Sequence, residues 1–298
     1  MTIYVETTGS DPQPGTHDAP VLTIERGLAL AQPGEVVQCG AGDFEGGISR
    51  KHFKDGVTLR GVPGKTRVVN TRQATHTFEL AALGSDPALT LENLIIHGAG
   101  QQYALKPRDG VGSAARPCLT VRNCTIYGGA IIAAHPKYCT WLTFENVTIC
   151  GVASDNPQHH PLYVLFCDEF HTRDLRILGR NPGNGISWIG STGTLTNLTL
   201  IAPPTAGGRQ QGLYLGDRVD DNGVYRRSQA VVSGVNVITG FQADGVNVMS
   251  RAVLDISGTH FSANRYAIRR ETAQATVHQH DNTFAEGAGR NTLNLKGL

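Results

Sequence analysis

The chain has 298 residues, of which 40% are hydrophobic and 17% are charged, and its net charge is +1. This length suits one large domain or two small ones, and 36 glycines with only 2 tryptophans favour many turns over a bulky helical core. The near-neutral charge lacks the basic footprint of nucleic-acid binding, and no apolar run approaches the roughly 20 residues of a membrane span, so we expect neither nucleic acid nor membrane as a partner.

The N-terminal segment begins "MTIYVETTGSD", which has neither the basic start nor the apolar core of a secretory signal. It continues with "GSD", "PGT", "TIERGLALA", "PGEVV" and "AGDFEGG", in that order. This arrangement resembles the N-terminal segment of pectate-lyase-like right-handed parallel β-helix proteins. The resemblance implies that residues 22–31 form a short helix that caps the first coil. We expect one domain over 1–298, with a cap segment at 1–45 and coils at 46–298.

A ten-residue phrase recurs further along: "LTLENLIIHG" at 89–98, "LTVRNCTIYG" at 119–128 and "LTFENVTICG" at 142–151. Within each copy apolar and polar residues alternate, which indicates strands on both sides of an asparagine bend. The aligned bend positions are Asn93, Asn123, Asn146, Asp174, Asn197 and Gly234, with a weaker copy near Asn282. Variable spacing between copies is typical of a solenoid with loop insertions, and stacked asparagines are expected to form a ladder.

The alignment predicts which columns face the core. Before the bend these are Leu91, Val121, Phe144 and Leu195. Directly after the bend they are Leu94, Cys124, Val147, Leu175, Leu198 and Val235. Two positions further on they are Ile96, Ile126, Ile149, Ile177, Leu200 and Val237. The outward column directly before the bend contains Glu92, Arg122, Glu145 and Arg173, whose charges alternate in sign. This alternation favours parallel stacking in register. The alternative is a chance pattern on a solvated face.

A third strand follows each phrase, as in "HHPLYVL", "GNGISWI", "QQGLYLG" and "ADGVNVM". Its predicted inward positions include Leu162, Val164, Ile186, Trp188, Leu213, Leu215, Val246, Val248, Leu293 and Leu295. Its outward positions include Tyr163, Ser187, Tyr214, Asn247, Arg269 and Asn294. Three parallel strands per turn predict an all-β fold, a single-stranded right-handed parallel β-helix of triangular section with a short N-terminal capping helix.

The outward row of the third strand is the candidate site, because aromatic faces beside hydrogen-bonding groups can hold a sugar chain. The alternative is an ordinary sheet face or a protein–protein surface. The candidate carbohydrate-binding residues are Lys106, His160, Tyr163, Tyr214, Asp217, Arg218, Asn247 and Arg269. A lyase would need a base and a group that neutralises the uronate, often calcium held by carboxylates. The candidate acids are Asp168, Glu169, Asp217, Asp220, Asp221 and Asp244, and the candidate bases are Lys106, Arg218, Arg251, Arg269 and Arg270, but no compact motif selects among them.

The densest polar stretch, "SDNPQHHPLYVLFCDEFH", places His160 and His171 on different sides of the coil, so we predict no metal site there. We predict no cofactor, with calcium expected only if the protein is a lyase. The six cysteines contain no CxxC pair, which argues against zinc. We expect Cys124 to be buried and reduced.

The resemblance to pectate-lyase-like β-helix proteins implies two alternative functions. The first is a structural or adhesive module of a phage virion, such as a capsid decoration, spike or fibre component. The second is a lyase or epimerase that acts on a uronate-containing polysaccharide. Three observations favour the virion module: the sequence shows no secretion signal, no catalytic motif, and no cap after "NTLNLKGL". An uncovered C-terminal end predicts a homo-oligomer, with a trimer as one form, or attachment to virion lattice proteins, unless "LKGL" folds back to plug it. The expected location is the virion, or otherwise the cytoplasm or an exterior reached without a visible signal peptide.

Overall fold

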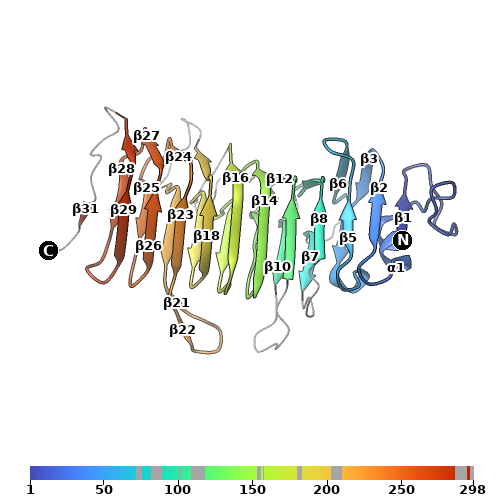
Figure 1. Cartoon of the computed structure of the whole chain (residues 1–298), viewed down its shortest axis with the longest axis horizontal. Helices are drawn as coiled ribbons and strands as arrows, with labels where there is room; N and C mark the ends of the chain where they lie inside the picture. Colours follow the sequence, from blue (N-terminus) through green and yellow to red (C-terminus); the bar gives the residue numbers. More distant parts are fainter. Residues whose placement is uncertain are drawn as a thin grey trace.

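The computed structural model describes residues 1–71, 76–81, 89–100, 102–108, 118–152, 156, 158–179, 183–202, 210–285 and 294–295. The chain winds into an elongated parallel β-solenoid whose coils stack along one axis, with the N-terminus at one end and the C-terminus at the other (Figure 1). The predicted all-β solenoid with three strands per coil is therefore confirmed.

The strands form three columns. The first column contains β1 (Thr2–Val5), β2 (Val36–Cys39), β5 (Thr58–Arg60), β8 (Leu89–Glu92), β11 (Cys118–Arg122), the first part of β14 (Trp141–Ile149) and of β16 (Phe170–Ile177), β18 (Thr192–Thr196), β23 (Gln229–Ser233), β26 (Val253–Ser257) and β29 (Thr276–His280). The second contains β3 (Gly42–Glu45), β6 (Thr66–Val69), β9 (Ile95–His97), β12 (Thr125–Tyr127), the second part of β14 and of β16, β19 (Thr199–Ile201), β24 (Asn236–Thr239), β27 (Thr259–Ser262) and β30 (Thr283–Phe284).

The third column is a separate sheet, and it carries the candidate site. It contains β4 (Ile48–Ser49), β7 (His76–Ala81), β10 (Tyr103–Arg108), β13 (Ile132–Ala134), β15 (Leu162–Leu165), β17 (Ile186–Ile189), β20 (Leu213–Gly216), β25 (Asp244–Val248), β28 (Tyr266–Arg270) and β31 (Asn294–Leu295). All its pairings in the described ranges are parallel. A short antiparallel hairpin of β21 (Arg218–Val219) and β22 (Tyr225–Arg226) projects from its edge (Figure 1).

The predicted asparagine bend separates the first two columns. Its residues adopt a left-handed backbone, with φ of 58° at Asn93, 50° at Asn146 and 55° at Asn197. Asparagine tolerates this region better than most residues because its short side chain bonds locally. The ladder is also present: the Asn146 amide donates to Oδ1 of Asn123 at 3.0 Å, and the Asn197 amide donates to Oδ1 of Asp174 at 3.0 Å.

The charged column before the bend is in register, as predicted. Arg122 Nε lies 3.2 Å from Glu92 Oε1, and Arg173 Nη2 lies 3.2 Å from Glu145 Oε1. Arg60 extends the series, with its Nε 2.6 Å from Glu92 Oε2. An exposed pair such as Arg173–Glu145 contributes at most about 1 kcal/mol. The alternation of charge along the column favours this register.

The interior is a continuous apolar core between the three columns. The predicted inward positions before the bend and in the described third strands are buried, and Phe170 packs between Phe144 and Trp188 with ring centroids 5.2 and 5.4 Å away. Cys124 is 2% exposed and free, as predicted. The predictions for Leu293 and for the side chains of Leu295 and Asn294 lie outside the described residues.

Two predicted inward positions are wrong. Val235 is 78% exposed, and Val237 is only half-buried, whereas Asn236 and Ile238 face the core. The pairing of Leu200 with Ile238 shows that this coil has one extra residue after the Gly234 bend. Because side chains alternate with a period of two, one inserted residue exchanges the two faces. In the last coil the left-handed residue is Asp281, one position before Asn282.

The N-terminal cap is α1 (Ile24–Leu30), within the predicted 22–31. Thr23 caps it by accepting the Arg26 backbone N–H at 3.2 Å. Gly27 allows close packing on the first coil, because a Cβ there would lie 2.6 Å from a Val5 methyl group. A short 3₁₀ turn, η1 (Arg50–His52), follows β4. None of the helices in the described ranges is long and apolar enough to cross a membrane.

Candidate functional site

The predicted outward row lies on the third sheet in a single line. Tyr163, Ser187, Tyr214, Asn247 and Arg269 are consecutive register partners on β15, β17, β20, β25 and β28. Adjacent parallel strands lie about 4.8 Å apart, so the row places one side chain on each rung along the solenoid axis. Within it Ser187 and Asn247 are buried, whereas Tyr163, Tyr214 and Arg269 are partly exposed. Such a line matches the shape of an extended linear polymer.

The row continues toward the N-terminus through His135 and Lys106. Leu105 pairs with Ala134, and Ala134 with Leu162, so the next residues, Lys106, His135 and Tyr163, occupy neighbouring rungs. His135 is not among the residues predicted from the sequence, because it directly follows Ala134, the last residue of β13. Continuing the alternation of inward and outward side chains for one residue beyond Ala134 identifies His135 as an outward residue.

We name the group formed by His76, Tyr103, Lys106, His135 and Tyr163 the Lys106 cluster. The Lys106 ammonium lies 2.9 Å from His76 Nε2 and 4.6 Å from the centre of the Tyr103 ring. The rings of Tyr103 and His135 are 5.5 Å apart, and those of His135 and Tyr163 stack at 5.0 Å with 6° between planes. A cation, two imidazoles and two phenols therefore meet on four rungs of one sheet.

His160, a candidate carbohydrate-binding residue, lies at the edge of this cluster. Its ring meets Tyr163 edge-on at 5.5 Å, and its Nδ1 accepts the backbone N–H of Asn184 at 3.0 Å. Burial, and then the neighbouring His159, lower the pKa of His160 to about 4. His160 is thus neutral at pH 7, with its proton on Nε2. His171, in contrast, lies on the first column beside Thr194 and Trp141.

The C-terminal half of the row has a different character. Arg269 is held by Glu271, with Nη2 2.8 Å from Oε1, and its Nη1 lies 3.6 Å from Asp244 Oδ2. Asp244 and Asn247 are 0% and 1% exposed. Burial raises the pKa of Asp244, against the opposing effect of Arg269. Burial also raises the pKa of the half-buried Tyr214, and the nearby Glu271 adds to this.

Asp217 and Arg218 belong to the base of the hairpin. Asp217 accepts the backbone N–H groups of Ser228 at 2.7 Å and Arg251 at 2.8 Å, and the Tyr225 hydroxyl at 2.6 Å. These three bonds fix the hairpin to the solenoid. Arg218 is exposed at the start of β21. The structure therefore does not bring either of them into the outward row.

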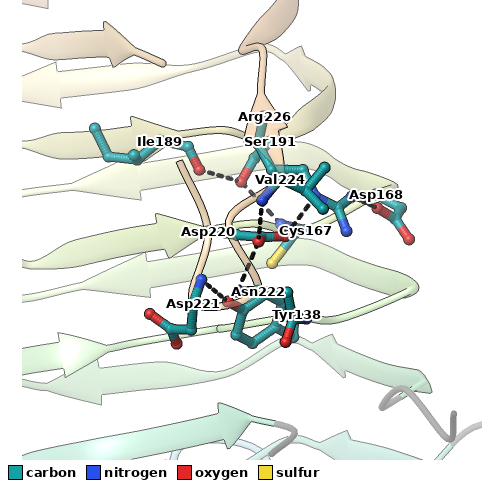
Figure 2. A network of polar contacts seen from close by, with 10 residues as sticks. All are labelled: Tyr138, Cys167, Asp168, Ile189, Ser191, Asp220, Asp221, Asn222, Val224 and Arg226. Carbon is teal, nitrogen blue, oxygen red and sulfur yellow. Dashed lines mark hydrogen bonds and ion pairs between the residues drawn. The ribbon is translucent and has the colours of Figure 1, made fainter. Parts of the chain in front are cut away.

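The hairpin folds back over earlier coils through a polar network (Figure 2). The buried Asp220 accepts the backbone N–H groups of Asn222 at 2.9 Å and Val224 at 3.0 Å. Arg226 joins this turn to an earlier coil, with Nε 3.0 Å from Asp220 Oδ2 and Nη1 3.0 Å from Asp168 Oδ1. Asp168 and Asp220, two of the candidate acids, serve this attachment.

The hairpin tip reaches a still earlier coil. The backbone N–H of Asp221 donates to the Tyr138 hydroxyl at 3.0 Å, and Lys137 Nζ lies 2.6 Å from Asp221 Oδ2, which lowers the pKa of that carboxyl. Beneath the hairpin lies a small apolar cluster, against which Tyr163 and Tyr214 pack: Tyr138, Leu165, Phe166 and Ile189. The hairpin therefore borders the outward row on one side.

Neither a protein-family model nor a curated protein matches this sequence. Solved structures do match. The pectate lyase Pel9A superposes with a TM-score of 0.59 at 13% identity, covering 98% of this chain and 81% of that one. The PL6 family alginate lyase AlyGC gives 0.58 at 11% identity over 96% of this chain, which spans only 39% of the enzyme. The A-module of the Azotobacter vinelandii mannuronan C-5 epimerase AlgE6 gives 0.57 at 11% identity, covering 83% and 68% of the two chains.

The chain is a right-handed parallel β-helix. This confirms the fold that the N-terminal resemblance implied, and at 11–13% identity the likeness establishes the fold alone.

Calcium, which a lyase of this fold would be expected to need, does not fit the residues described here. Within the described ranges no three His, Cys, Asp or Glu side chains converge as metal ligands. Near the row, Asp244 and Glu271 are occupied by Arg269. We therefore derive no step through calcium.

Proposed function

We propose that the protein binds a uronate-containing polysaccharide along the outward row and acts on it as a lyase or a C5 epimerase. The observation that carries this proposal is the Lys106 cluster, in which an ammonium group, imidazoles and phenols lie within contact distance on neighbouring rungs. These are the side chains that abstract and return protons and stabilise negative charge near pH 7.

Both reactions begin with the same step. A base removes the proton on C5, next to the uronate carboxylate, and the electron pair moves into the carboxylate. In a lyase the pair then forms the C4–C5 double bond and expels the C4 oxygen, which takes a proton from an acid. In an epimerase C5 instead regains a proton on its opposite face.

Lys106 suits the carboxylate, because a fixed ammonium stabilises the negative charge that develops there. His135 suits the proton transfer, because it lies on the next rung and stacks on Tyr163, which fixes its ring plane. Tyr103, 5.5 Å from His135 on the other side, is a candidate for the partner acid.

The structural neighbours motivate the choice of reaction class. Pel9A and AlyGC are described as pectate and alginate lyases, and AlgE6 as a mannuronan C-5 epimerase. Pectate, alginate and mannuronan are all uronate polymers. The phage virion hypothesis has no comparable support among these matches.

The test is incubation with polygalacturonate and alginate. Lyase products are detected by the ultraviolet absorbance of the unsaturated uronate, and epimerase turnover by deuterium at C5 in heavy water. Lys106→Met and His135→Ala should each lower the rate by roughly 10²-fold or more. Thr120→Val, on the outward side of the first column, is the matched control and should leave it unchanged.

The catalytic proposal is refuted if no uronate polymer gives either an unsaturated product or deuterium exchange at C5. Binding without turnover would instead favour an adhesive module. Full activity in both Lys106→Met and His135→Ala would move the chemistry away from this cluster.

A further inference from the structure

The two halves of the outward row differ in charge. The Lys106 cluster supplies a cation, whereas in the C-terminal half the one row cation, Arg269, is flanked by the carboxylates of Glu271 and Asp244 at 2.8 and 3.6 Å. We name the group of Tyr214, Asp244, Asn247, Arg269 and Glu271 the Asn247 subsite. Its formal charge is negative when both acids are ionised, so a substrate carboxylate is repelled here.

The floor of this subsite contains buried polar atoms that lack partners among the described residues. They are Asp244 Oδ1, Asn247 Oδ1 and Arg269 Nε. Buried polar groups are nearly always hydrogen-bonded, so these three atoms on the adjacent strands β25 and β28 require an explanation. Two of these atoms are hydrogen-bond acceptors and one is a donor. A ligand that satisfies all three must therefore donate at least two hydrogen bonds and accept one.

Tyr214 and Arg269 form the rim of the subsite. Asn247 lies between Tyr214 and Arg269 on the two adjacent rungs, and both are only partly buried. A ligand that reaches the Asn247 amide must therefore displace the Tyr214 ring or the Arg269 side chain. A half-buried tyrosine ring beside a polar floor is a common platform for the apolar face of a sugar.

We propose that the Asn247 subsite binds the hydroxyl groups of an uncharged sugar unit, so that the substrate combines uronate with neutral residues. Adjacent sugar hydroxyls supply the donors that Asp244 and Asn247 need and an acceptor for Arg269. A uronate unit also has hydroxyl groups, but its carboxylate would lie beside the carboxylates of Asp244 and Glu271, which repel it. This inference rests on the proposed function, and it narrows the substrate class to heteropolysaccharides.

The experiment compares the affinity of the protein for defined tetrasaccharides by calorimetry. One probe alternates galacturonate with rhamnose, a second alternates glucuronate with N-acetylglucosamine, and a third contains galacturonate only. The wild type should bind at least one alternating probe about tenfold or more tightly than the third, because a site built for hydrogen bonds rejects ligands that leave its polar groups unpaired. This comparison needs no variant.

Asn247→Leu removes the amide at nearly constant size and should abolish the preference by weakening only the alternating probe. Thr120→Val again serves as the control. Equal or tighter binding of the all-galacturonate probe overturns the inference, as does an undiminished preference in Asn247→Leu. If that variant loses thermal stability but keeps the preference, the floor holds an internal water only, and the inference is wrong.

Failure of the proposed function gives a different result. If no acidic oligosaccharide binds, the proposed function fails and this inference falls with it. If all-uronate polymers are bound and turned over without a preference, the lyase or epimerase proposal stands and only the neutral subsite is refuted.

Discussion

His160 should make the stability of the protein depend on pH in a window that a single substitution can isolate. Its folded pKa of about 4, set by burial and then by His159, compares with an ordinary value of 6.5. The unfolded chain therefore binds more protons between these values. The contribution is present in full above pH 6.5 and is lost as the pH falls toward 4, and it amounts to at most about 3 kcal/mol.

His160→Asn is the informative variant, because the asparagine Oδ1 takes the place of Nδ1 and can still accept the Asn184 N–H. It cannot titrate. Denaturant unfolding at a series of pH values from above 6.5 to about 4 should show the wild type losing more stability than His160→Asn. Taking the difference cancels the titration of other groups, including Asp244, whose raised pKa acts in the opposite direction. Parallel losses in the two proteins, or an imidazole that titrates near 6.5 by NMR in the folded state, would refute the reasoning.

Three further predictions concern the ladder, the thiols and the hairpin. Asn197→Ala should destabilise the protein by about 2–4 kcal/mol, because alanine is strained at a φ of 55° and the hydrogen bonds to Asp174 and Val235 are lost. Asn197→Gly should cost about 1 kcal/mol less, because glycine adopts this φ without strain. Equal losses of stability in chemical denaturation would contradict the strain argument. Cys124 should react with thiol reagents only after unfolding, because burial raises its pKa to about 12; rapid native labelling, located by mass spectrometry, would disprove this. Arg226→Met should increase proteolytic cleavage within 217–228 without changing the global unfolding midpoint, and unchanged digestion would show that its two carboxylate contacts do not hold the hairpin.

Much of the fold could be predicted from the sequence because each coil is the template for the next. The bend at Asn93 recurs at Asn123 and Asn146, and each copy confirms the parity of the others. The same logic predicts Tyr163, Tyr214 and Arg269 in one outward row, where the strand register places them. A repeated pattern thus carries long-range information that a single strand lacks.

The two wrong predictions of inward residues, Val235 and Val237, lie where the repeat is longer by one residue. After Gly234 the chain inserts Val235 as a solvent-exposed extra residue, and Asn236 turns inward, where its Oδ1 accepts the Leu198 N–H at 2.8 Å. Hydrophobicity favoured Val235 as a core residue. The sequence contains no local signal that a buried asparagine bonded to the neighbouring coil would replace it.

The candidate chemistry was harder to predict than the fold, and the reason is physical. Stacking constrains the inward side chains of every coil, but it leaves the outward ones free, so functional groups follow no period. Asp217 and Asp220 are among the acids that the sequence offers as candidates, yet they hold the hairpin in place. Lys106 and His135 share no motif and lie 29 positions apart in the chain, yet the strand register makes them neighbours. In a solenoid, a search for reactive groups is therefore more informative along the stacked columns than along the sequence.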